Sequence, residues 1–247
     1  MGKYNIFWES FYKSSEKFFL TDGFKKEYFV FTDSKRIFDQ ENPRVHVCDQ
    51  KDEGWPFNTL LRFHFFEKIT PQLENFDFTF FFNANMLFND FVMKDFLPDE
   101  NQLLVIKHPG ILMSNRSKFP YEANKLSKAF ISDDKGIYYF MGSLNGGDSS
   151  AFNELIIKLK HNIDLDLENN IIAIWWDESH LNNYMLSANY KILSEDHVFI
   201  DGNYYDKIPK IIIRDKNSFG GHNYLRNLEL DFTTKVKIFI KALLKKK

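Results

Sequence analysis

The sequence predicts an α/β fold in a single domain, and three observations lead to that prediction. Short apolar runs recur along the 247 residues, and stretches with helical spacing lie between them. No internal repeat, low-complexity linker or Pro/Gly-rich boundary divides the chain. A chain of this length can bury one substantial core. Strands that alternate with helices predict a mostly parallel sheet, whose site lies at the carboxyl ends of the strands.

Six short apolar runs predict the strands, because their apolar stretches are short enough for buried strands and they are bounded by polar or turn residues. In chain order these runs are 27–33, 76–85, 102–110, 137–142, 171–176 and 210–215. Two stretches predict helices by the spacing of their apolar residues, 8–19 and 151–160, and Ser150 is the candidate N-cap of the second.

The ends of three of these runs carry the sequences most suited to a site. They are Asn83-Ala84-Asn85, the HPG stretch at 108–110 and the WWDES stretch at 175–179. Because the site of an α/β sheet lies at the carboxyl ends of its strands, we expect these stretches to meet at one edge. The two asparagines raise a question of their own, because two neutral carboxamides interrupt an otherwise apolar segment.

The last stretch of the chain differs from the rest. Residues 235–247 place apolar side chains on one helical face and lysines on the others. This pattern is typical of a basic amphipathic helix that lies on a membrane surface. A C-terminal helix packed on the core, with a solvated lysine face, is the alternative. We therefore expect one main domain over 1–230 and a basic tail over 231–247.

Composition and charge exclude several classes. The formal net charge is −2, so the chain as a whole is not a polyanion binder and no nucleic-acid partner is expected. No run of 18 apolar residues and no N-terminal apolar signal are present, and Cys48 is the one cysteine. We expect a cytoplasmic protein. The 28 Phe, 11 Tyr and 4 Trp indicate a Phe-rich core, or aromatic platforms for sugars or bases.

Asp177 and Glu178 are the strongest candidates for chemistry. They follow two tryptophans and precede a helical spacing, so we expect them at a helix N-terminus, where the dipole favours ionised carboxylates. N-capping by Asp177 is the plainer interpretation. Adjacent carboxylates point in different directions, so they cannot flank a glycosidic bond as a hydrolase pair, which needs a separation of roughly 5–10 Å.

Four further positions have open interpretations. Arg62 lies in an apolar helical stretch over 60–66. It is either a snorkelling surface cation or a buried cation that binds an anion such as phosphate, and Lys216 could bind the same anion. His108 is more often a structural hydrogen-bonding residue than a ligand, and no metal-binding spacing accompanies it. Gly146-Gly147 permits close backbone approach. These residues alone indicate a sugar- or nucleotide-like site.

Nine stretches, taken together and in order, resemble one enzyme family. They are GKY (2–4), YFVFTD (28–33), GWPFNTLLRFH (54–64), FFFNANMLF (80–88), HPG (108–110), FPYE (119–122), YYFMGSLNGG (138–147), WWDESHLNNY (175–184) and RDKN (214–217). The chain resembles the retaining α-1,3-galactosyl- and N-acetylgalactosaminyltransferases that include the human blood group A and B enzymes, and especially their bacterial branch. The resemblance implies a GT-A fold with a UDP-sugar donor site beside a glycan acceptor site.

The resemblance also answers the question of the asparagines. Animal members of the family carry Asp-x-Asp where this chain has Asn83 and Asn85, and that pair holds Mn²⁺ against the donor diphosphate. Carboxamides bind a hard cation far more weakly than carboxylates do. The bacterial branch is similar to this chain in using Asn-x-Asn and no metal. No cofactor is expected, so Arg62 and Lys216 must meet the charge of the leaving group.

Roles for the other residues follow from the same resemblance. Glu178 matches the glutamate on the reacting face of the donor sugar, a nucleophile or an electrostatic stabiliser, and Asp177 matches the residue that holds donor-sugar hydroxyls. The donor side further comprises Tyr4, Arg62, Asn83, Asn85, Met141, Ser143 and Lys216. The acceptor side comprises His108, Tyr121 and Trp175. Met141 and Ser143 match the positions that discriminate the two donors, and a bulky methionine favours UDP-galactose.

The chain departs from the family pattern in three places. The first strand of the fold, expected just upstream of Gly2, is missing. Trp176 replaces a histidine, and Pro120 replaces a threonine whose hydroxyl faces the acceptor side. The expected function is a metal-independent retaining glycosyltransferase that forms a blood-group-like surface glycan at the inner leaflet. A carbohydrate-binding pseudoenzyme is the main alternative, and a glycosidase is the other.

Overall fold

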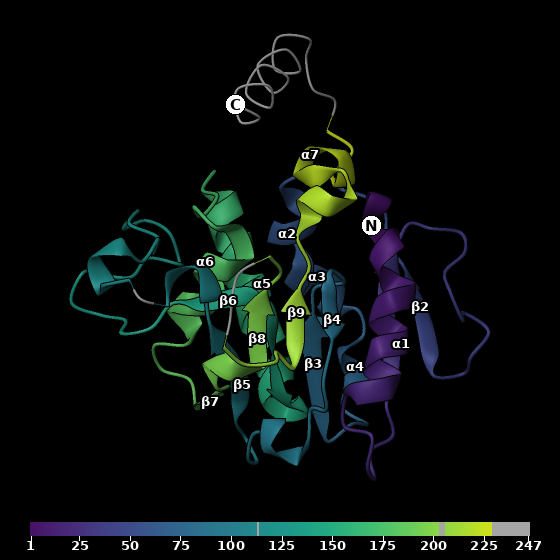
Figure 1. Ribbon diagram of the computed structural model, residues 1–247. Helices are drawn as coiled ribbons and strands as arrows, with labels where there is room; N and C mark the ends of the chain where they lie inside the picture. Colours follow the sequence, from purple (N-terminus) through teal and green to yellow (C-terminus); the bar gives the residue numbers. More distant parts are fainter. Residues whose placement is uncertain (113, 203–205, 229–247) are drawn as a thin grey trace, which may run out of the picture.

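The computed structural model describes residues 1–112, 114–202 and 206–228 of the chain, and Figure 1 shows the path of the backbone. The strands are β1 (Tyr28–Thr32), β2 (Val45–Asp49), β3 (Phe78–Phe82), β4 (Met86–Phe88), β5 (Leu103–Lys107), β6 (Phe140–Asp148), β7 (Tyr190–Ile192), β8 (Val198–Ile200) and β9 (Ile211–Ile213). The helices are α1 (Trp8–Phe18), α2 (Phe57–Leu60), α3 (Arg62–Glu67), α4 (Thr70–Leu73), α5 (Ser149–Glu168), α6 (Trp176–Tyr184) and α7 (Gly221–Leu225). Short 3₁₀ turns join them, the first over Gly2–Phe7. The α/β class is confirmed.

The strands form three separate sheets. The largest has the order β3-β6-β5-β7, a second pairs β1 with β2, and a third has the order β4-β9-β8. The expectation of a mostly parallel sheet is wrong, because β6 runs antiparallel to both β3 and β5 and β4 runs antiparallel to β9. The pairs β1–β2, β5–β7 and β8–β9 are parallel.

Gly146 and Gly147 explain how β6 fits between its neighbours. Their φ angles are +150° and +140°. A Cβ on Gly146 would lie 2.3 Å from the Thr79 carbonyl oxygen, and one on Gly147 would lie 2.4 Å from that of Gln102. The close backbone approach expected at this pair is therefore an approach to the flanking chain of the sheet, and it is not an approach to a ligand.

Most of the expected elements are present, and one is wrong. Strands form within 27–33, 76–85, 102–110, 137–142 and 210–215, but β6 continues beyond the predicted run to Asp148. Residues 171–175 form no strand, and Ile172, Ile174 and Trp175 are exposed. A continuous apolar run without a neighbouring strand has no ladder to join. Helix α5 begins two residues earlier than expected, with Asp148 as its N-cap in place of Ser150.

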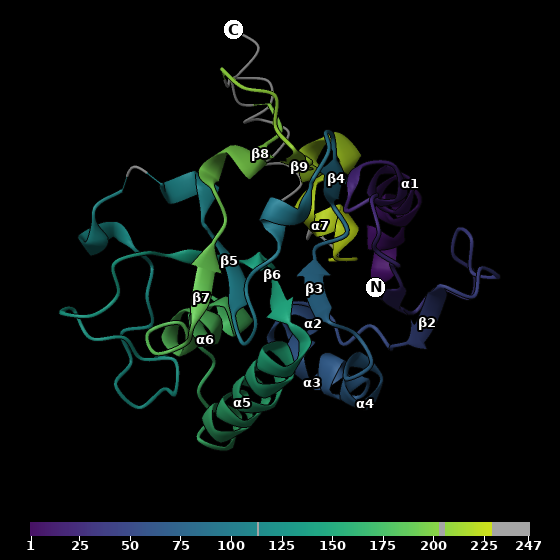
Figure 2. The same ribbon diagram turned by 90° about the horizontal axis from the view of Figure 1, so that it is seen from below.

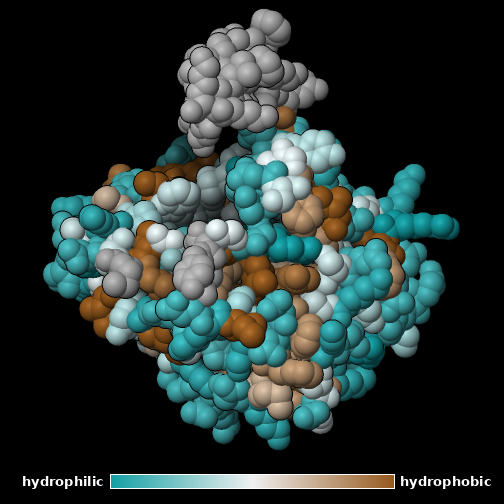
Figure 3. Space-filling view, in the orientation of Figure 1, coloured by the Kyte–Doolittle hydropathy of each residue, from teal (hydrophilic) through white to brown (hydrophobic). Residues whose placement is uncertain are grey.

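Two apolar layers cover the central sheet. One contains α1 and the β4-β9-β8 sheet, and the other contains α3, α5 and α6. Figure 2 shows these groups on opposite faces of β3, β6, β5 and β7. The outer surface in Figure 3 is mostly hydrophilic, with small apolar patches. This sandwich brings the end of β3 beside the start of β6, which in turn lies against the start of α6.

Two expectations concern sequence that the described structure does not include. The basic tail over 231–247 lies outside the described residues, and a strand ahead of Gly2 lies outside the chain. Both stay predictions. Within the described ranges, no helix is both long enough and apolar enough to cross a membrane.

Candidate active site

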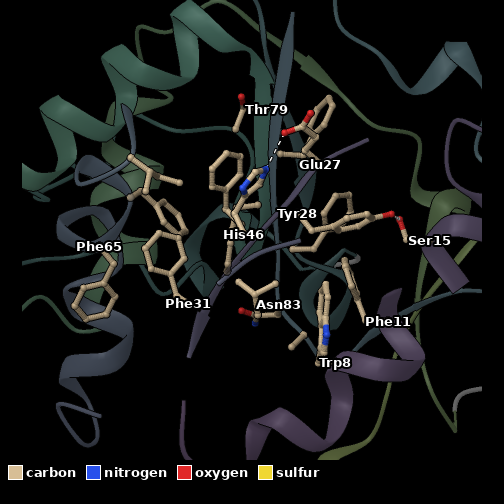
Figure 4. Close-up of a pocket in the computed structure, with 18 of the residues that line it drawn as sticks. Trp8, Phe11, Ser15, Glu27, Tyr28, Phe31, His46, Phe65, Thr79 and Asn83 are labelled. Atoms are coloured by element: carbon tan, nitrogen blue, oxygen red, sulfur yellow. Dashed lines mark hydrogen bonds and ion pairs between the residues drawn. The ribbon is translucent and has the colours of Figure 1, made fainter. Parts of the chain in front are cut away.

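A cavity of about 1170 Å³ opens between β1, β3 and the helices around them. Its wall has two kinds of surface. Aromatic side chains from the strands and α1 line one part, and polar groups line the other, including Tyr4, Arg62, Asn83, Lys216 and Arg226. Figure 4 shows Phe31 and Phe65 on one side and Trp8, Phe11 and Tyr28 on the other, with Asn83 between them. The carboxyl end of β3 therefore meets the cavity at its polar part.

The Asn-Ala-Asn turn follows β3 directly, and its two asparagines have different environments. The Asn83 N–H donates to the Ser143 carbonyl oxygen at 2.8 Å, which fixes the turn against β6, and Asn83 borders the cavity. Asn85 is 2% exposed, and its side-chain amide donates to the Arg214 carbonyl oxygen at 3.1 Å. Asn83 is therefore available to a ligand, whereas the amide of Asn85 is used within the fold.

Arg214 fixes this turn from the other side. Its guanidinium donates to the carbonyl oxygens of Ala84, Asn85 and Met86, and also to that of Phe7. It stacks over the Phe7 ring, 4.7 Å from the centroid. Because backbone carbonyls need donors when they leave a strand, one buried cation supplies several at once. The sequence analysis assigned Arg214 no role.

Glu178 lies in the first turn of α6, as expected, and both its carboxylate oxygens have donors. The Tyr139 hydroxyl donates to Oε1 at 2.7 Å, and the Gly142 N–H donates to Oε2 at 2.6 Å. A Cβ on Gly142 would lie 3.1 Å from that of Glu178, so glycine permits this approach. Two neutral donors orient the carboxylate and leave its negative charge uncompensated.

Asp177 is buried behind Glu178 and paired with Arg62. The Arg62 Nη1 donates to its Oδ2 at 2.5 Å and to the Gly142 carbonyl oxygen at 2.9 Å. The guanidinium also lies 4.4 Å from the centre of the Phe81 ring. Burial raises the pKa of Asp177 to about 7, although Arg62 lowers it. Asp177 does not cap α6, so the N-capping interpretation is wrong, and Arg62 is a buried cation.

Lys216 and Arg226 form the basic part of the cavity. Burial, together with the nearby charges of Arg226 and Arg62, lowers the pKa of Lys216 to about 8. Neither Lys216 nor Arg226 belongs to an ion pair within the described part of the chain. Their contacts are aromatic: Lys216 lies over the Tyr4 ring and Arg226 over the Trp55 ring, 5.5 Å and 3.3 Å from the centroids. Two cations beside a cavity without carboxylate partners suit an anionic ligand.

Met141 and Ser143 lie on β6, beside Glu178 and the Asn-Ala-Asn turn. Met141 is 2% exposed and packs in the core, and the Ser143 hydroxyl lies 3.3 Å from its sulfur. Ser143 is half-buried. Of this pair, Ser143 is the residue nearer the surface, and the buried methionine restricts the space behind it.

The three residues expected on the acceptor side, His108, Tyr121 and Trp175, do not line the cavity. The His108 Nδ1 accepts from the Gly110 N–H, which leaves Nε2 without a partner in the described structure. The Tyr121 hydroxyl donates to the Tyr138 carbonyl oxygen, and its ring packs against Tyr139. Trp175 is 41% exposed. His108 and Trp175 therefore present polar and aromatic surface, and Tyr121 supports the tyrosine that contacts Glu178.

Four residues of the site were missed in the sequence analysis: Trp55, Tyr139, Arg214 and Arg226. Trp55 packs edge-on against Trp176, with ring centroids 4.1 Å apart, and so joins α6 to Arg226. Each of these contacts crosses a long stretch of sequence. Trp55, Tyr139 and Arg214 lie inside stretches that carry the family resemblance, and Arg226 lies outside them. None of the four had been given a role.

The family comparison agrees with this geometry. The model of glycosyltransferase family 6 matches residues 1–224. The geometry of the site fits a transferase that moves sugar residues. The chain belongs to glycosyltransferase family 6. It is a hexosyltransferase, as its named relatives are.

Relatives from bacteria and mammals are similar to this chain. The O-antigen biosynthesis glycosyltransferase WbnI of Escherichia coli is 37% identical over 217 residues, which cover 87% of this chain and 91% of the relative. The human globoside alpha-1,3-N-acetylgalactosaminyltransferase 1 is 29% identical over 81% of this chain and 59% of its own length. The rat histo-blood group ABO system transferase 2 is 30% identical over 80% and 60%. Blood-group-type and globoside-type transferases are thus its homologues.

Proposed function

We propose that this protein is a metal-independent, retaining glycosyltransferase of GT-A architecture. It transfers α-galactose, in preference to α-N-acetylgalactosamine, from the UDP-sugar to O3 of a fucosylated galactose and so builds a blood-group-like surface glycan. The observation that carries the proposal is Glu178, whose two oxygens are oriented by Tyr139 and Gly142 beside the Arg62–Asp177 pair. An oriented carboxylate without a compensating cation suits a carbon that becomes positive in the transition state.

The proposed donor site uses the basic part of the cavity. Lys216 and Arg226 have no carboxylate partners among the described residues, so a diphosphate can form ion pairs with both side chains. Tyr4 lies against Lys216 and offers a ring to the nucleotide. Asp177, fixed by Arg62, is placed to accept from donor-sugar hydroxyls, and Met141 behind Ser143 leaves little room for an acetamido group. His108 and Trp175 supply the proposed acceptor surface, which Tyr121 supports through Tyr139.

Metal independence is proposed from the donor set at the Asn-Ala-Asn turn. The Asn85 amide already donates to a carbonyl oxygen, so it is turned away from any cation. Asn83 offers one neutral oxygen. No cluster of three or more His, Cys, Asp or Glu suited to a metal ion occurs among the described residues. Asn83 can instead donate hydrogen bonds to a phosphate oxygen.

The test is transfer from UDP-galactose and UDP-N-acetylgalactosamine, side by side, to 2′-fucosyllactose in the presence of EDTA. We expect an α-linked product, faster from UDP-galactose, and its anomeric configuration is read by NMR. No product from either donor together with no UDP binding would favour the carbohydrate-binding pseudoenzyme. UDP binding without product would keep the donor site and place the doubt on the choice of acceptor. A requirement for Mn²⁺ would overturn metal independence.

The basic tail carries a separate part of the proposal. Residues 235–247 would hold the enzyme on the anionic inner leaflet, where lipid-linked acceptors lie. Deleting these residues should release the protein from anionic liposomes without changing its unfolding temperature. Loss of the folded state on deletion would instead support a tail that packs on the core.

A further inference from the structure

Residues 171–175, which we call the apolar segment, lie at the surface although their composition is that of a buried strand. Ala173 is 1% exposed, whereas Ile172, Ile174 and Trp175 are 47%, 56% and 41% exposed. Single exposed apolar side chains are ordinary on a protein surface, but several that lie together mark an interaction site. The apolar segment is therefore a candidate contact surface.

Buried polar side chains hold the apolar segment in this position. The Ile174 N–H donates to the Glu122 Oε2 at 2.7 Å, and the Trp175 N–H donates to the Ser179 hydroxyl at 3.0 Å. Both Glu122 and Ser179 are buried. Because side chains satisfy these N–H groups, the segment needs no neighbouring strand, and its apolar side chains stay at the surface.

The loop that follows Glu122 is fixed beside the apolar segment. The Lys128 N–H donates to the Asp166 carboxylate at 2.7 Å, and the Ile171 N–H donates to the Asp166 carbonyl oxygen at 2.8 Å. Leu126 lies on this loop between the two anchored residues, and its side chain is 79% exposed. Leu126 therefore adds exposed apolar surface next to the apolar segment.

The exposed charges on this loop are basic. Between residues 115 and 128 the charged side chains are Arg116, Lys118, Glu122, Lys125 and Lys128, and Glu122 is buried. Two of the lysines flank Leu126. Exposed acids lie further along the chain, at Asp133 and Asp134 and at Glu168 near the end of α5. Lysines beside exposed leucine, isoleucine and tryptophan side chains suit the headgroup level of an anionic membrane.

We propose that the apolar segment and Leu126 dock the protein on the surface of an anionic bilayer. Ile172, Ile174, Trp175 and Leu126 would enter the boundary between headgroups and acyl chains, and the lysines of the loop would meet the lipid phosphates. This contact is separate from the basic tail. Trp175 is also expected on the acceptor side, so docking would bring that side to the membrane. That consequence rests on the proposed function, whereas the docking itself does not.

The test is binding of the full chain to vesicles made of equal parts phosphatidylglycerol and phosphatidylcholine, measured by cosedimentation. One variant combines Leu126→Ser, Ile172→Ser and Ile174→Ser. The matched control combines Ile157→Ser, Leu186→Ser and Ile208→Ser, three exposed apolar residues elsewhere on the surface.

The partition coefficient should fall by about tenfold or more in the first variant and stay within about twofold in the control. The basic tail is present in both chains, so it cannot produce this difference. Equal binding of the two variants, or no binding of the parent chain, would overturn the proposal.

A second measurement covers a combined variant that fails to fold. Lipids brominated on their acyl chains quench the fluorescence of tryptophans that reach them. They should quench the parent chain, and Trp175→Phe should remove most of this quenching, because Trp8 is buried and Trp55 and Trp176 are half-buried. Quenching of equal size in Trp175→Phe would overturn the proposal.

The oligomeric state provides a further check. A dimer that forms without vesicles, and that the combined variant abolishes, would assign this surface to a second copy of the chain and overturn the proposal. Sedimentation velocity measures this state. None of these readouts needs a donor or acceptor, so failure of transfer leaves the result unaffected.

Discussion

The site has an acidic corner, formed by Asp177 and Glu178, and a basic corner, formed by Lys216 and Arg226. The two corners differ in how their charges are matched. At the acidic corner, Asp177 is paired with Arg62, and Glu178 accepts two hydrogen bonds from neutral groups. At the basic corner, Lys216 and Arg226 lie against aromatic rings and have no carboxylate partner in the described part of the chain. Hydrogen bonds within the protein therefore orient the carboxylates of the acidic corner, whereas aromatic rings are the described neighbours of the basic corner's two cations.

This difference separates two tasks that a transferase must perform. The groups that face the reacting carbon must be oriented before substrate arrives, because catalysis depends on preorganised charge. The groups that bind the leaving diphosphate must be free until it arrives. Changes at the acidic corner should therefore lower turnover, and changes at the basic corner should weaken donor binding.

Replacing Glu178→Gln should have the largest effect. The change removes the charge at the reacting face, so kcat should fall by about 10³-fold. UDP affinity should stay within about twofold of the parent value, because no diphosphate contact is lost. The matched control is Glu154→Gln, an exposed glutamate on α5. A tenfold or smaller loss of kcat would contradict a role for Glu178 at the reacting centre.

Replacing Lys216→Met should mainly weaken the donor complex. Loss of one charge-assisted hydrogen bond should lower UDP affinity by about 10- to 100-fold in calorimetry. The free variant should be more stable, on the order of 1 kcal/mol, because a partly buried cation is removed. Lys158→Met, at an exposed lysine on α5, is the control. Unchanged affinity would place the diphosphate elsewhere.

The lowered pKa of Lys216, about 8, gives this prediction a pH dependence. Above pH 8 the folded lysine loses its charge, so UDP binding should weaken as pH rises from 7 to 9 and should stay flat in Lys216→Met. Between pH 8 and about 10.5 the unfolded chain binds more protons at this residue than the folded one, so its contribution to stability rises with pH.

The matched pair Asn83→Asp and Asn85→Asp should separate ligand contact from support. Asn83→Asp puts a negative charge at the cavity, so transfer in EDTA should fall about tenfold and recover in part with Mn²⁺. Asn85→Asp buries a carboxylate against the Arg214 carbonyl and should lower the free energy of unfolding by about 2–4 kcal/mol. Transfer and urea unfolding measure the two effects. Lost stability in Asn83→Asp, with lost transfer and unchanged stability in Asn85→Asp, would contradict the geometry of the turn.

Tyr139→Phe should have the smallest effect, about tenfold on kcat with KM unchanged, because Glu178 keeps its second donor. Burial and Glu178 both raise the pKa of Tyr139, so its hydroxyl stays a donor across the working range. Steady-state kinetics with both UDP-sugars measure this loss. An unchanged kcat would limit Tyr139 to packing.

Local patterns in the sequence predicted much of the fold and part of the site. The α6 start that holds Asp177 and Glu178 was predictable, because two acids between a pair of tryptophans and a helical spacing fit a helix N-terminus. The failed strand over 171–176 has the apolar content of a strand, but the sheet offers it no neighbour. The antiparallel placement of β6 depends on Gly146 and Gly147 and on its pairing partners, which no local pattern specifies.

The partners of the site residues were less predictable. Asn83 and Asn85 look equivalent in the sequence, and only the distant Arg214 makes one of them structural. Tyr139 lies in a stretch that carries the family resemblance but had no assigned role, and Arg226 lies outside every such stretch. Physical reasoning identified Arg62 and Lys216 as candidate anion-binding cations, but the resemblance to a known family was needed to assign them to a diphosphate.

The Arg214 contacts also bear on the order in which the protein becomes competent. This guanidinium ties together carbonyls that lie 129 and 207 positions away in the sequence. Contacts of such separation form late, since loop closure costs entropy before they stabilise anything. A chain emerging from the ribosome cannot close the Asn-Ala-Asn turn until β9 has been synthesised. The turn that we propose to face the donor would thus be assembled only in a nearly finished molecule, and a product truncated before Arg214 would lack these contacts.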